Sequence, residues 1–225
     1  MSNFRRYAIY YLPDDAALAA FGAHWLGWDV TRAASANQPE TDVPLREFTE
    51  NPRKYGFHGT LKPPFFLADG RSADDLVAAV EALAASVPAF EVAGLEVAEL
   101  GSLLALIPTE KSEALSNLAA RLVQELDAFR APPNEAELQR RRMAGLTQNQ
   151  EEMLTTWGYP YVLDEFRFHL TLTGALGHAD LELAKDVARR QLPPLPRPFP
   201  IQSVWLAGEL EDGMFVALRR FALSG

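Results

Sequence analysis

The sequence contains no cysteine among its 225 residues. This absence excludes disulfide bonds, thiolate nucleophiles, cysteine-based zinc sites and iron–sulfur clusters. It fits a reducing compartment, and we expect a cytoplasmic protein. The first residues, MSNFRRYAIYYLPDD, contain only a short apolar run, so they predict neither a signal peptide nor an anchor.

Long apolar runs and an excess of basic residues are also missing. No segment approaches the roughly 20 apolar residues of a transmembrane helix, so no membrane contact is expected. The net charge is −9, whereas proteins that bind long nucleic acids usually carry a basic excess that neutralises phosphates. Long nucleic acid is therefore not an expected partner, although a small anionic substrate remains open. The sequence indicates no particular protein partner.

Apolar residues nevertheless make up 48% of the chain, enough for one large domain or two lobes that share a core. Alternating and aromatic segments predict strands, and apolar residues at helical spacing predict helices. The first histidine-containing strand is expected to end at Pro63, because proline cannot donate a ladder hydrogen bond. Expected strands cover 6–12, 57–62, both sides of a turn at 101–102, 165–174 and a hairpin around 211–213. Expected helices cover 14–28, 72–87, 112–129, parts of 131–160 and 178–192, and 29–55 is expected to be mostly loop.

Two parts of the chain repeat one order of landmarks. The phrase H-G-T-L at 58–61 is followed by a helix and by FEVAGLEVAEL, a turn and LLALIP. The phrase H-L-T-L at 169–172 is followed by a helix and by FPIQSVWLAGEL, a turn and MFVALRR. Order and spacing agree although identity is weak, which indicates an internal duplication.

The repeated phrase places an imidazole and a hydroxyl on one face of a strand. Side chains at i and i+2 project together, so His58 lies with Thr60, and His169 lies with Thr171. If the copies are related by a pseudo-twofold axis, the two pairs face each other across a cleft. Two imidazoles can act as general base and general acid on a phosphodiester near neutral pH, while the hydroxyls donate to its oxygens.

A single H-x-T is weak evidence, because both residue types occur on half-buried strands for ordinary reasons. Here two of only four histidines lie in H-x-T-L, at matched positions of the two copies. This pattern favours a catalytic function. The other two histidines are expected to have structural roles, with His24 at the boundary of a helix and His178 at a helix start.

The two motifs in a duplicated chain resemble those of the 2H phosphoesterase superfamily. That resemblance implies an α+β fold of two lobes, each an antiparallel sheet with helices outside, around a central cleft. It also implies action on small cyclic phosphodiesters, with His58 and His169 catalytic, Thr60 and Thr171 binding phosphate, and no cofactor or metal. We expect one such domain over 1–225, with repeat copies at about 50–110 and 160–225, completed by the N-terminal strand and the helices of 112–157.

One branch of that superfamily is more similar still. The segments RKYGFHGTLKPPF, TQNQEEMLTTWGYPYV and FRFHLTLTG resemble an uncharacterised family encoded beside C–P lyase genes and labelled as phosphonate metabolism proteins. This resemblance implies a role near phosphonate breakdown but no particular reaction.

Four further residues are candidates for substrate binding. Strand alternation places Lys62 on the face of His58, and places Arg167 and Thr173 on the face of His169. The two cations are candidates for a second anionic group, although rim charges that contact only water are an equal alternative. Tyr10 is a candidate because the first strand is expected beside the cleft.

Three functions remain in competition. The first is a metal-independent cyclic phosphodiesterase that acts on a cyclic nucleotide or a related ribosyl cyclic phosphate. The second is a protein that binds a small phosphorylated metabolite without turnover, as an accessory of a phosphonate-degrading complex. A metal-dependent hydrolase is disfavoured, because the sequence contains no H-x-H, H-E-x-x-H or cysteine ligand set.

Overall fold

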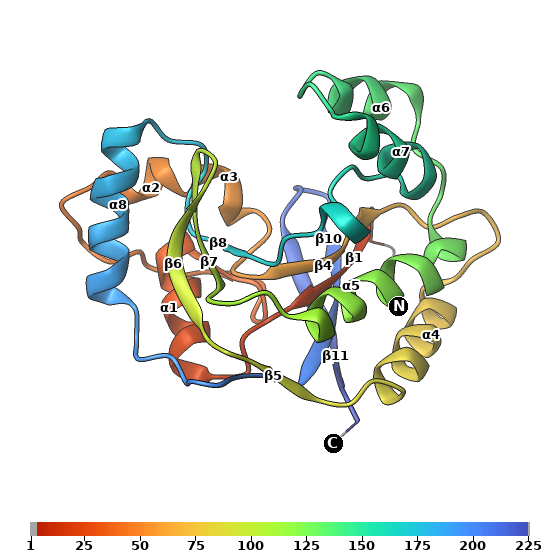
Figure 1. Ribbon diagram of the computed structural model, residues 1–225, viewed down its shortest axis with the longest axis horizontal. Coiled ribbons are helices and arrows are strands. Elements are labelled where there is room, and N and C mark those ends of the chain that lie inside the picture. Colours follow the sequence, from red (N-terminus) through yellow and green to blue (C-terminus); the bar gives the residue numbers. More distant parts are fainter. Residues whose placement is uncertain (1–3, 225) are drawn as a thin grey trace.

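A computed structural model describes residues 4–224 and shows an α+β fold built on one antiparallel sheet (Figure 1). The fold class expected from the sequence is thus confirmed. The sheet has seven strands in the order β11 (Phe215–Ala222), β10 (Ser203–Glu209), β1 (Tyr7–Tyr11), β4 (Gly59–Phe65), β8 (Leu170–Thr171), β7 (Leu103–Pro108) and β6 (Leu95–Leu100). Two short antiparallel pairs accompany it: β2 (Trp28–Asp29) with β3 (Ala34–Ser35), and β5 (Phe90–Val92) with β9 (Phe199–Ile201).

Helices surround the sheet, and their ends follow the capping residues of the sequence. Ser72 accepts a hydrogen bond from the Asp75 N–H, as expected for an N-cap. Thr147 and Gln150 form the expected capping box, and Gly158 ends the same helix in the left-handed region at φ 74°. The helices are α1 (Ala16–Leu26), α2 (Leu45–Phe48), α3 (Glu50–Arg53), α4 (Ala73–Ala85), α5 (Glu113–Glu125), α6 (Glu135–Arg142), α7 (Gln148–Trp157) and α8 (His178–Gln191), with 3-10 turns η1 (Asp127–Phe129) and η2 (Leu163–Glu165). Among residues 4–224, no helix combines the length and the apolarity that a bilayer crossing requires.

The repeated order of landmarks appears as a repeated order of elements. β4, α4, β5, β6 and β7 follow each other as β8, α8, β9, β10 and β11 do. The hairpins are interleaved, because β7 of the first set pairs with β8 of the second, while β10 lies on the side of β4 with β1 between them. This arrangement brings β4 and β8 side by side in the middle of the sheet.

Apolar side chains cover both faces of the central strands. On β1, Tyr7, Ile9 and Tyr11 belong to the main core, whereas Ala8 and Tyr10 belong to a smaller cluster on the opposite face. The period of two along one strand thus divides its side chains between two clusters. The smaller cluster, here called the rear cluster, comprises Ala8, Tyr10, Leu12, Trp28, Val30, Ala207, Phe215 and Val216.

Two predicted strand boundaries are wrong. β4 does not end at Pro63 but continues through Pro64 to Phe65. Within the described residues, β4 pairs with β8 only at Gly59, so beyond that point its outer edge needs no N–H donors and proline is tolerated. The strand expected at 165–174 is reduced to Leu170–Thr171, because η2 and an extended stretch precede it.

Candidate active site

The two H-x-T motifs lie on adjacent strands at the middle of the sheet. β4 and β8 pair antiparallel with Gly59 opposite Leu170. Continuing this register by one residue in each direction sets His58 across from Thr171, and Thr60 across from His169. Because Gly59 and Leu170 turn to the other face, all four motif side chains project from one face of the sheet.

Packing beneath the motifs fixes this register. A Cβ atom added to Gly59 would lie 2.6 Å from Cε2 of Phe168, so the ring occupies the space that a side chain would need. Phe168, Leu170 and Leu172 are buried, whereas His169 and Thr171 between them are partly exposed. The alternation expected for the second motif is confirmed.

Each imidazole is oriented by a hydrogen bond between its Nδ1 and the backbone carbonyl two residues earlier in the chain. Nδ1 of His58 lies 2.9 Å from the carbonyl oxygen of Gly56, and Nδ1 of His169 lies 2.7 Å from that of Arg167. A carbonyl only accepts, so each Nδ1 carries the proton and each neutral ring presents the lone pair of Nε2. The Thr60 hydroxyl donates to Nε2 of His58 at 3.0 Å, and no hydrogen bond to Nε2 of His169 occurs among residues 4–224.

Both rings are neutral at pH 7. Burial lowers the pKa of His58 from 6.5 to about 4, an effect that the bond to Gly56 opposes and a charge on His169 increases. Burial also lowers the pKa of His169, and the bond to the Arg167 carbonyl opposes it. Since a charge on His169 acts on His58, the two rings lie near each other.

Aromatic side chains pack closely around His58. The ring of Tyr10 lies 3.9 Å from the imidazole, centroid to centroid, at an interplanar angle of 34°. Tyr55 lies 6.1 Å from the same imidazole and 5.2 Å from Phe215 of the rear cluster. Tyr10 is fully buried, and its hydroxyl has no hydrogen-bond partner within residues 4–224. Tyr10 therefore packs against the candidate catalytic ring and is not exposed to a ligand.

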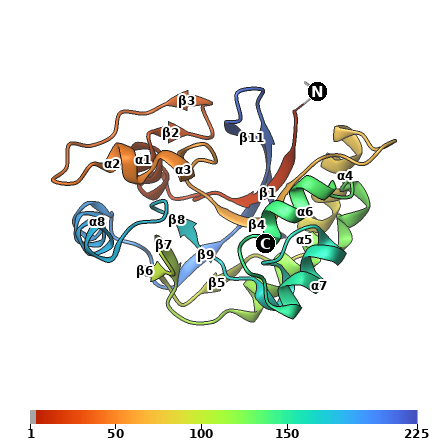
Figure 2. The same ribbon diagram turned by 90° about the horizontal axis from the view of Figure 1, so that it is seen from above.

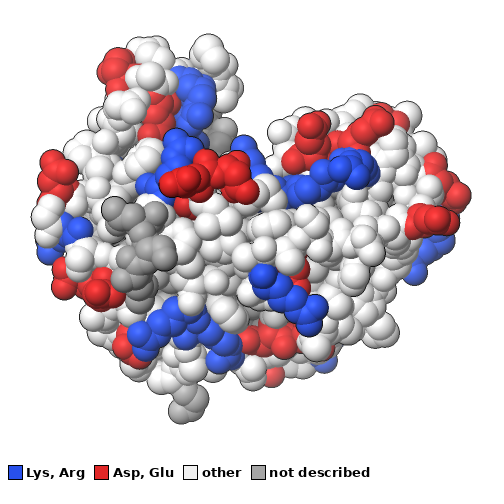
Figure 3. Space-filling model, turned by 180° about the vertical axis from the view of Figure 1, so that it is seen from behind, with Lys and Arg blue, Asp and Glu red and all other residues white. Residues whose placement is uncertain are grey.

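Two walls rise from the central strands. Figure 1 shows α2, α3, α8 and the β6–β7 turn on one side, and α6 with α7 on the other. Seen from above, β4 and β8 lie between these groups (Figure 2). The molecular surface is hollowed between them, with Lys and Arg side chains along part of the rim (Figure 3).

The structure corrects the placement of Lys62. Tyr10 pairs with Thr60 but Ile9 pairs with Lys62, so β4 has one extra residue and the strand bulges. The bulge turns Lys62 away from the face of Thr60. Its side chain is 2% exposed, and its Nζ donates to the carbonyl oxygen of Val123 in α5 at 3.0 Å. Lys62 is thus inaccessible to a ligand, and the expectation that it shares the face of His58 is wrong.

The other two substrate-binding candidates differ from each other. Thr173 is fully buried, and its hydroxyl accepts a hydrogen bond from the Leu104 N–H at 3.0 Å, so it too is inaccessible. Arg167 is exposed and forms no ion pair within the described part of the chain. It remains a candidate for contact with an anion.

The connecting segment between the copies contributes residues that strand alternation does not identify. Arg141 of α6 places its Cζ 4.4 Å from the ring centroid of Tyr159, which follows α7. The Arg141 side chain is only 19% exposed. Arg141 and Tyr159 are 18 residues apart in the sequence, with α7 between them, so no local sequence signal predicts the pair.

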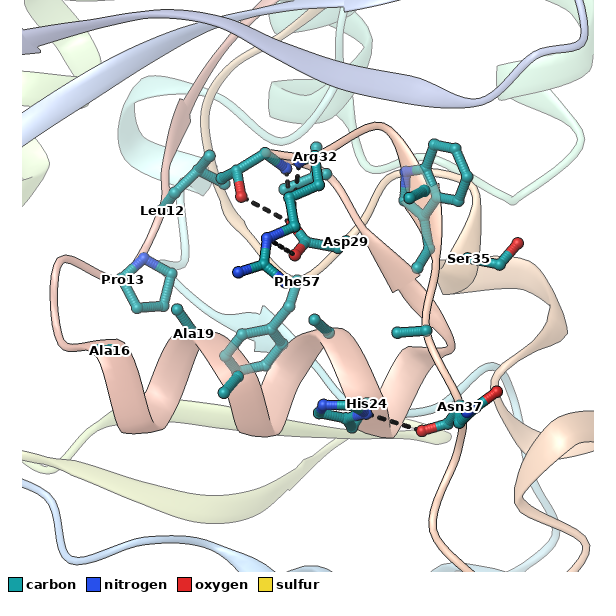
Figure 4. Close-up of a pocket in the computed structure, with 17 residues that line it drawn as sticks. Leu12, Pro13, Ala16, Ala19, His24, Asp29, Arg32, Ser35, Asn37 and Phe57 are labelled. Carbon is teal, nitrogen blue, oxygen red and sulfur yellow. Dashed lines mark hydrogen bonds and ion pairs between the residues drawn. The ribbon is translucent and has the colours of Figure 1, made fainter.

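A second hollow lies apart from the motifs, between α1 and the β2–β3 region (Figure 4). It is bordered by His24, whose Nδ1 lies 2.8 Å from the carbonyl oxygen of Asn37. Asp29 in the same hollow accepts hydrogen bonds from Thr31 and forms an ion pair with Arg32. Its polar groups are paired with each other, so we place the candidate active site at the two motifs.

One cluster of possible metal ligands occurs among residues 4–224, and it excludes the motif histidines. Glu99, His178 and Glu182 lie close together and are exposed. The ammonium group of Lys185 lies 2.7 Å from Glu99 and 3.3 Å from Glu182, so a cation of the protein already neutralises these carboxylates.

A family model described as "Protein of unknown function (DUF1045)" matches residues 60–216. The chain belongs to this family. The match includes His169 and Thr171 and begins at Thr60, two residues after His58.

Two curated relatives of this DUF1045 chain carry the name ribose 1,5-bisphosphate phosphokinase PhnN. The protein of Janthinobacterium sp. (strain Marseille) is 38% identical over 190 residues, which is 80% of this chain and 41% of the relative. The protein of Laribacter hongkongensis (strain HLHK9) is 34% identical over 182 residues, or 78% of this chain and 42% of the relative. The DUF1045 chain thus spans about two fifths of the length of these relatives.

Solved structures similar to this DUF1045 chain include those of Escherichia coli LigT. The LigT complex with 3′-AMP aligns over 99% of this chain and 100% of LigT, with a TM-score of 0.48 and 17% identity. The complex with NADP+ aligns over 100% of both chains, with a TM-score of 0.47 and 18% identity.

Proposed function

We propose that the chain is a metal-independent phosphoesterase that hydrolyses a small cyclic phosphodiester. His58 and His169 act as the general acid–base pair, and Thr60 and Thr171 donate to the nonbridging phosphate oxygens. The proposal rests on one observation: four motif side chains project from one sheet face, with both Nδ1 atoms anchored so that both Nε2 atoms serve the reaction.

The reaction needs one proton removed and one proton supplied. The base accepts a proton from water as the water oxygen bonds to phosphorus, and the acid donates a proton to the ring oxygen as its bond to phosphorus breaks. The two threonine hydroxyls donate to the charged nonbridging oxygens. Thr60 currently donates to Nε2 of His58, so its hydroxyl rotates to the phosphate when substrate binds and frees that nitrogen.

The surroundings of the two rings distinguish their roles. His58 is enclosed by Tyr10 and Tyr55, and its pKa is lowered to about 4. We infer that His169, the less enclosed ring, receives the first proton, after which its charge lowers the pKa of His58 further. We assign His58 as the base and His169 as the acid in ring opening, and substrate binding assists because a phosphate anion raises the pKa of a neighbouring imidazole.

The names of the curated relatives suggest the substrate. A ribose 5-phosphate that carries a 1,2-cyclic phosphate yields ribose 1,5-bisphosphate when water attacks phosphorus and the bond to O2 breaks. Relatives named for a kinase of that bisphosphate contain a region similar to this chain. We propose such a ribosyl cyclic phosphate as substrate, with 2′,3′-cyclic nucleotides as the alternative, and a place in phosphonate breakdown.

The test is hydrolysis of a panel of 2′,3′-cyclic nucleotides and ribosyl cyclic phosphates by the wild-type protein, with and without EDTA. His58→Ala and His169→Ala should each lower kcat at least 1,000-fold, since loss of a general acid or base costs about 10²–10⁴-fold and the pair acts as a unit. EDTA should have no effect. His24→Ala, outside the site, is the control. Full activity in either motif variant refutes the proposal.

One observation favours a second candidate, a protein that binds a phosphorylated metabolite without turnover. Both imidazoles are neutral at pH 7, so the unliganded site holds no proton for a leaving group. Tight binding of ribosyl phosphates, with no turnover of any cyclic phosphate between pH 5 and 8, would establish this function instead.

A further inference from the structure

The segment between the two copies forms one wall above the motifs. α6 and α7 belong to neither repeated set of elements and rise on the far side of the central strands from α8 (Figures 1 and 2). Arg141 lies near the end of α6, and Tyr159 follows the Gly158 cap of α7. The guanidinium of Arg141 therefore packs over Tyr159 at the point where the wall returns to the sheet.

Tyr159 connects this wall with the surroundings of His58. Burial raises the pKa of Tyr159, nearby Tyr55 adds to that effect, and Arg141 opposes it. Tyr159 and Tyr55 in turn contribute to the raised pKa of Tyr10, whose ring stacks on His58. Tyr159 thus lies between Arg141, which packs on it, and Tyr10, which stacks on His58.

Arg141 is a largely buried arginine of this wall that is incompletely paired. Its Nε is buried and has no hydrogen-bond partner among residues 4–224, and its Nη2 reaches Glu137 only at 3.4 Å. By contrast, Arg130 donates to Asp127 at 2.8 Å, and Arg142 donates to Glu151 at 2.7 Å. A buried guanidinium donor without an acceptor is costly. The side chain as a whole is 19% exposed, so its terminal nitrogens can form a charge-assisted bond to an anion between the walls.

We propose that Arg141, held flat against Tyr159, forms a second anion subsite that binds the distal phosphate of a substrate with two phosphate groups. The cyclic phosphate occupies the two H-x-T motifs, and the sugar spans the distance between motif and wall. This inference rests on the proposed function and narrows its substrate class to bisphosphate-type ribosyl cyclic phosphates. It also assigns α6–α7 a role in selecting substrate.

The test compares two probes that differ by one phosphate. Ribose 1-phosphate and ribose 1,5-bisphosphate are titrated calorimetrically into the wild-type protein, Arg141→Gln and Arg140→Gln. Arg140 is the matched control, since it lies on the same helix and its side chain is 66% exposed. Wild type and Arg140→Gln should bind the bisphosphate about 10- to 100-fold more tightly than the monophosphate, as expected for one charge-assisted pair.

Arg141→Gln should abolish that preference and leave affinity for the monophosphate unchanged. Arg141→Lys should retain part of it, because the charge remains while the planar stacking on Tyr159 is lost. Equal affinity of the wild type for both probes, no binding of either, or an undiminished preference in Arg141→Gln overturns the subsite. Loss of preference in Arg141→Gln without turnover of any cyclic phosphate would instead reject the proposed function and leave the subsite standing.

Discussion

Titration of the two motif histidines provides a test that needs no substrate. The perturbation is acidification from pH 7.5 to pH 4, followed by long-range ¹H–¹⁵N NMR of the imidazole nitrogens. At pH 7.5 both rings should show the Nδ1–H tautomer, because Gly56 and Arg167 carbonyls accept from those nitrogens. The chain has four histidines, so His→Gln variants assign each signal. On acidification His169 should take up its proton first, below pH 6.5, and His58 near pH 4.

The lowered pKa of His58 also sets the size of an effect of pH on the free energy of unfolding. A pKa lowered from 6.5 to about 4 corresponds to about 3 kcal/mol, which solvent screening of a partly exposed ring reduces to about 2 kcal/mol. The unfolded chain binds this proton at about pH 6.5 and the folded chain only near pH 4. The contribution of His58 to the free energy of unfolding is therefore complete above pH 6.5 and is lost as the pH falls to 4.

Urea unfolding at pH 7.5 and pH 4.5 measures this effect as a difference between wild type and His58→Gln. Between pH 7.5 and pH 4.5, the free energy of unfolding of the wild type should fall by about 2 kcal/mol more than that of the variant, because glutamine binds no proton. Tyr10→Leu, which opens the imidazole to water, should move the pKa of His58 back toward 6.5. A wild-type His58 that titrates at or above pH 6 would refute the assignment of His58 as the base.

Three further outcomes are expected. Burial lowers the pKa of Lys62 to about 8, so the free energy of unfolding of the wild type relative to Lys62→Met should rise by about 3 kcal/mol between pH 7.5 and 10.5. The exposed control Lys111→Met should show no such trend, and a KM raised by Lys62→Met would contradict its placement away from the site. Gly59→Ala should lower the free energy of unfolding by about 1–3 kcal/mol, because the added methyl group overlaps with Phe168. Urea unfolding should show that the double variant with Phe168→Leu recovers part of this loss.

The motif side chains could be predicted because they depend on local geometry. Alternation along an extended strand is a property of the backbone, so the shared face of His169 and Thr171 follows from their spacing. The same rule failed for Lys62, because an extra residue in β4 between the partners of Tyr10 and Ile9 reverses the face at that point, and a second register shift follows between Ile9 and Tyr7. No residue before the two prolines indicates this bulge, and the prolines remain in the strand only because its outer edge is unpaired there.

The arrangement around the motifs depends on pairings between distant parts of the chain. The β6–β7 hairpin lies beside β8, and the β10–β11 hairpin lies on the side of β4, so each repeated set completes the other's half of the sheet. Similar hairpins are equally suited to pairing within their own copy, and the sequence does not distinguish these alternatives. The position of α6–α7 opposite α8 is equally non-local, so the sequence does not predict the packing of Arg141 over Tyr159 in this wall.

The interleaved sheet also places the two copies of the motif in different surroundings. On the outer side of each motif, the residue paired with Thr60 is Tyr10 of β1, and the residue paired with Thr171 is Ala105 of β7. A tyrosine at this position supplies a ring that packs on the imidazole of His58, whereas an alanine has no side chain long enough to cover His169. Burial is the largest cause of the lowered pKa of both histidines, and Tyr10 of the flanking strand adds to the burial of His58. Under the proposed mechanism, Tyr10 beside the first motif and Ala105 beside the second thus give the general base and the general acid different surroundings.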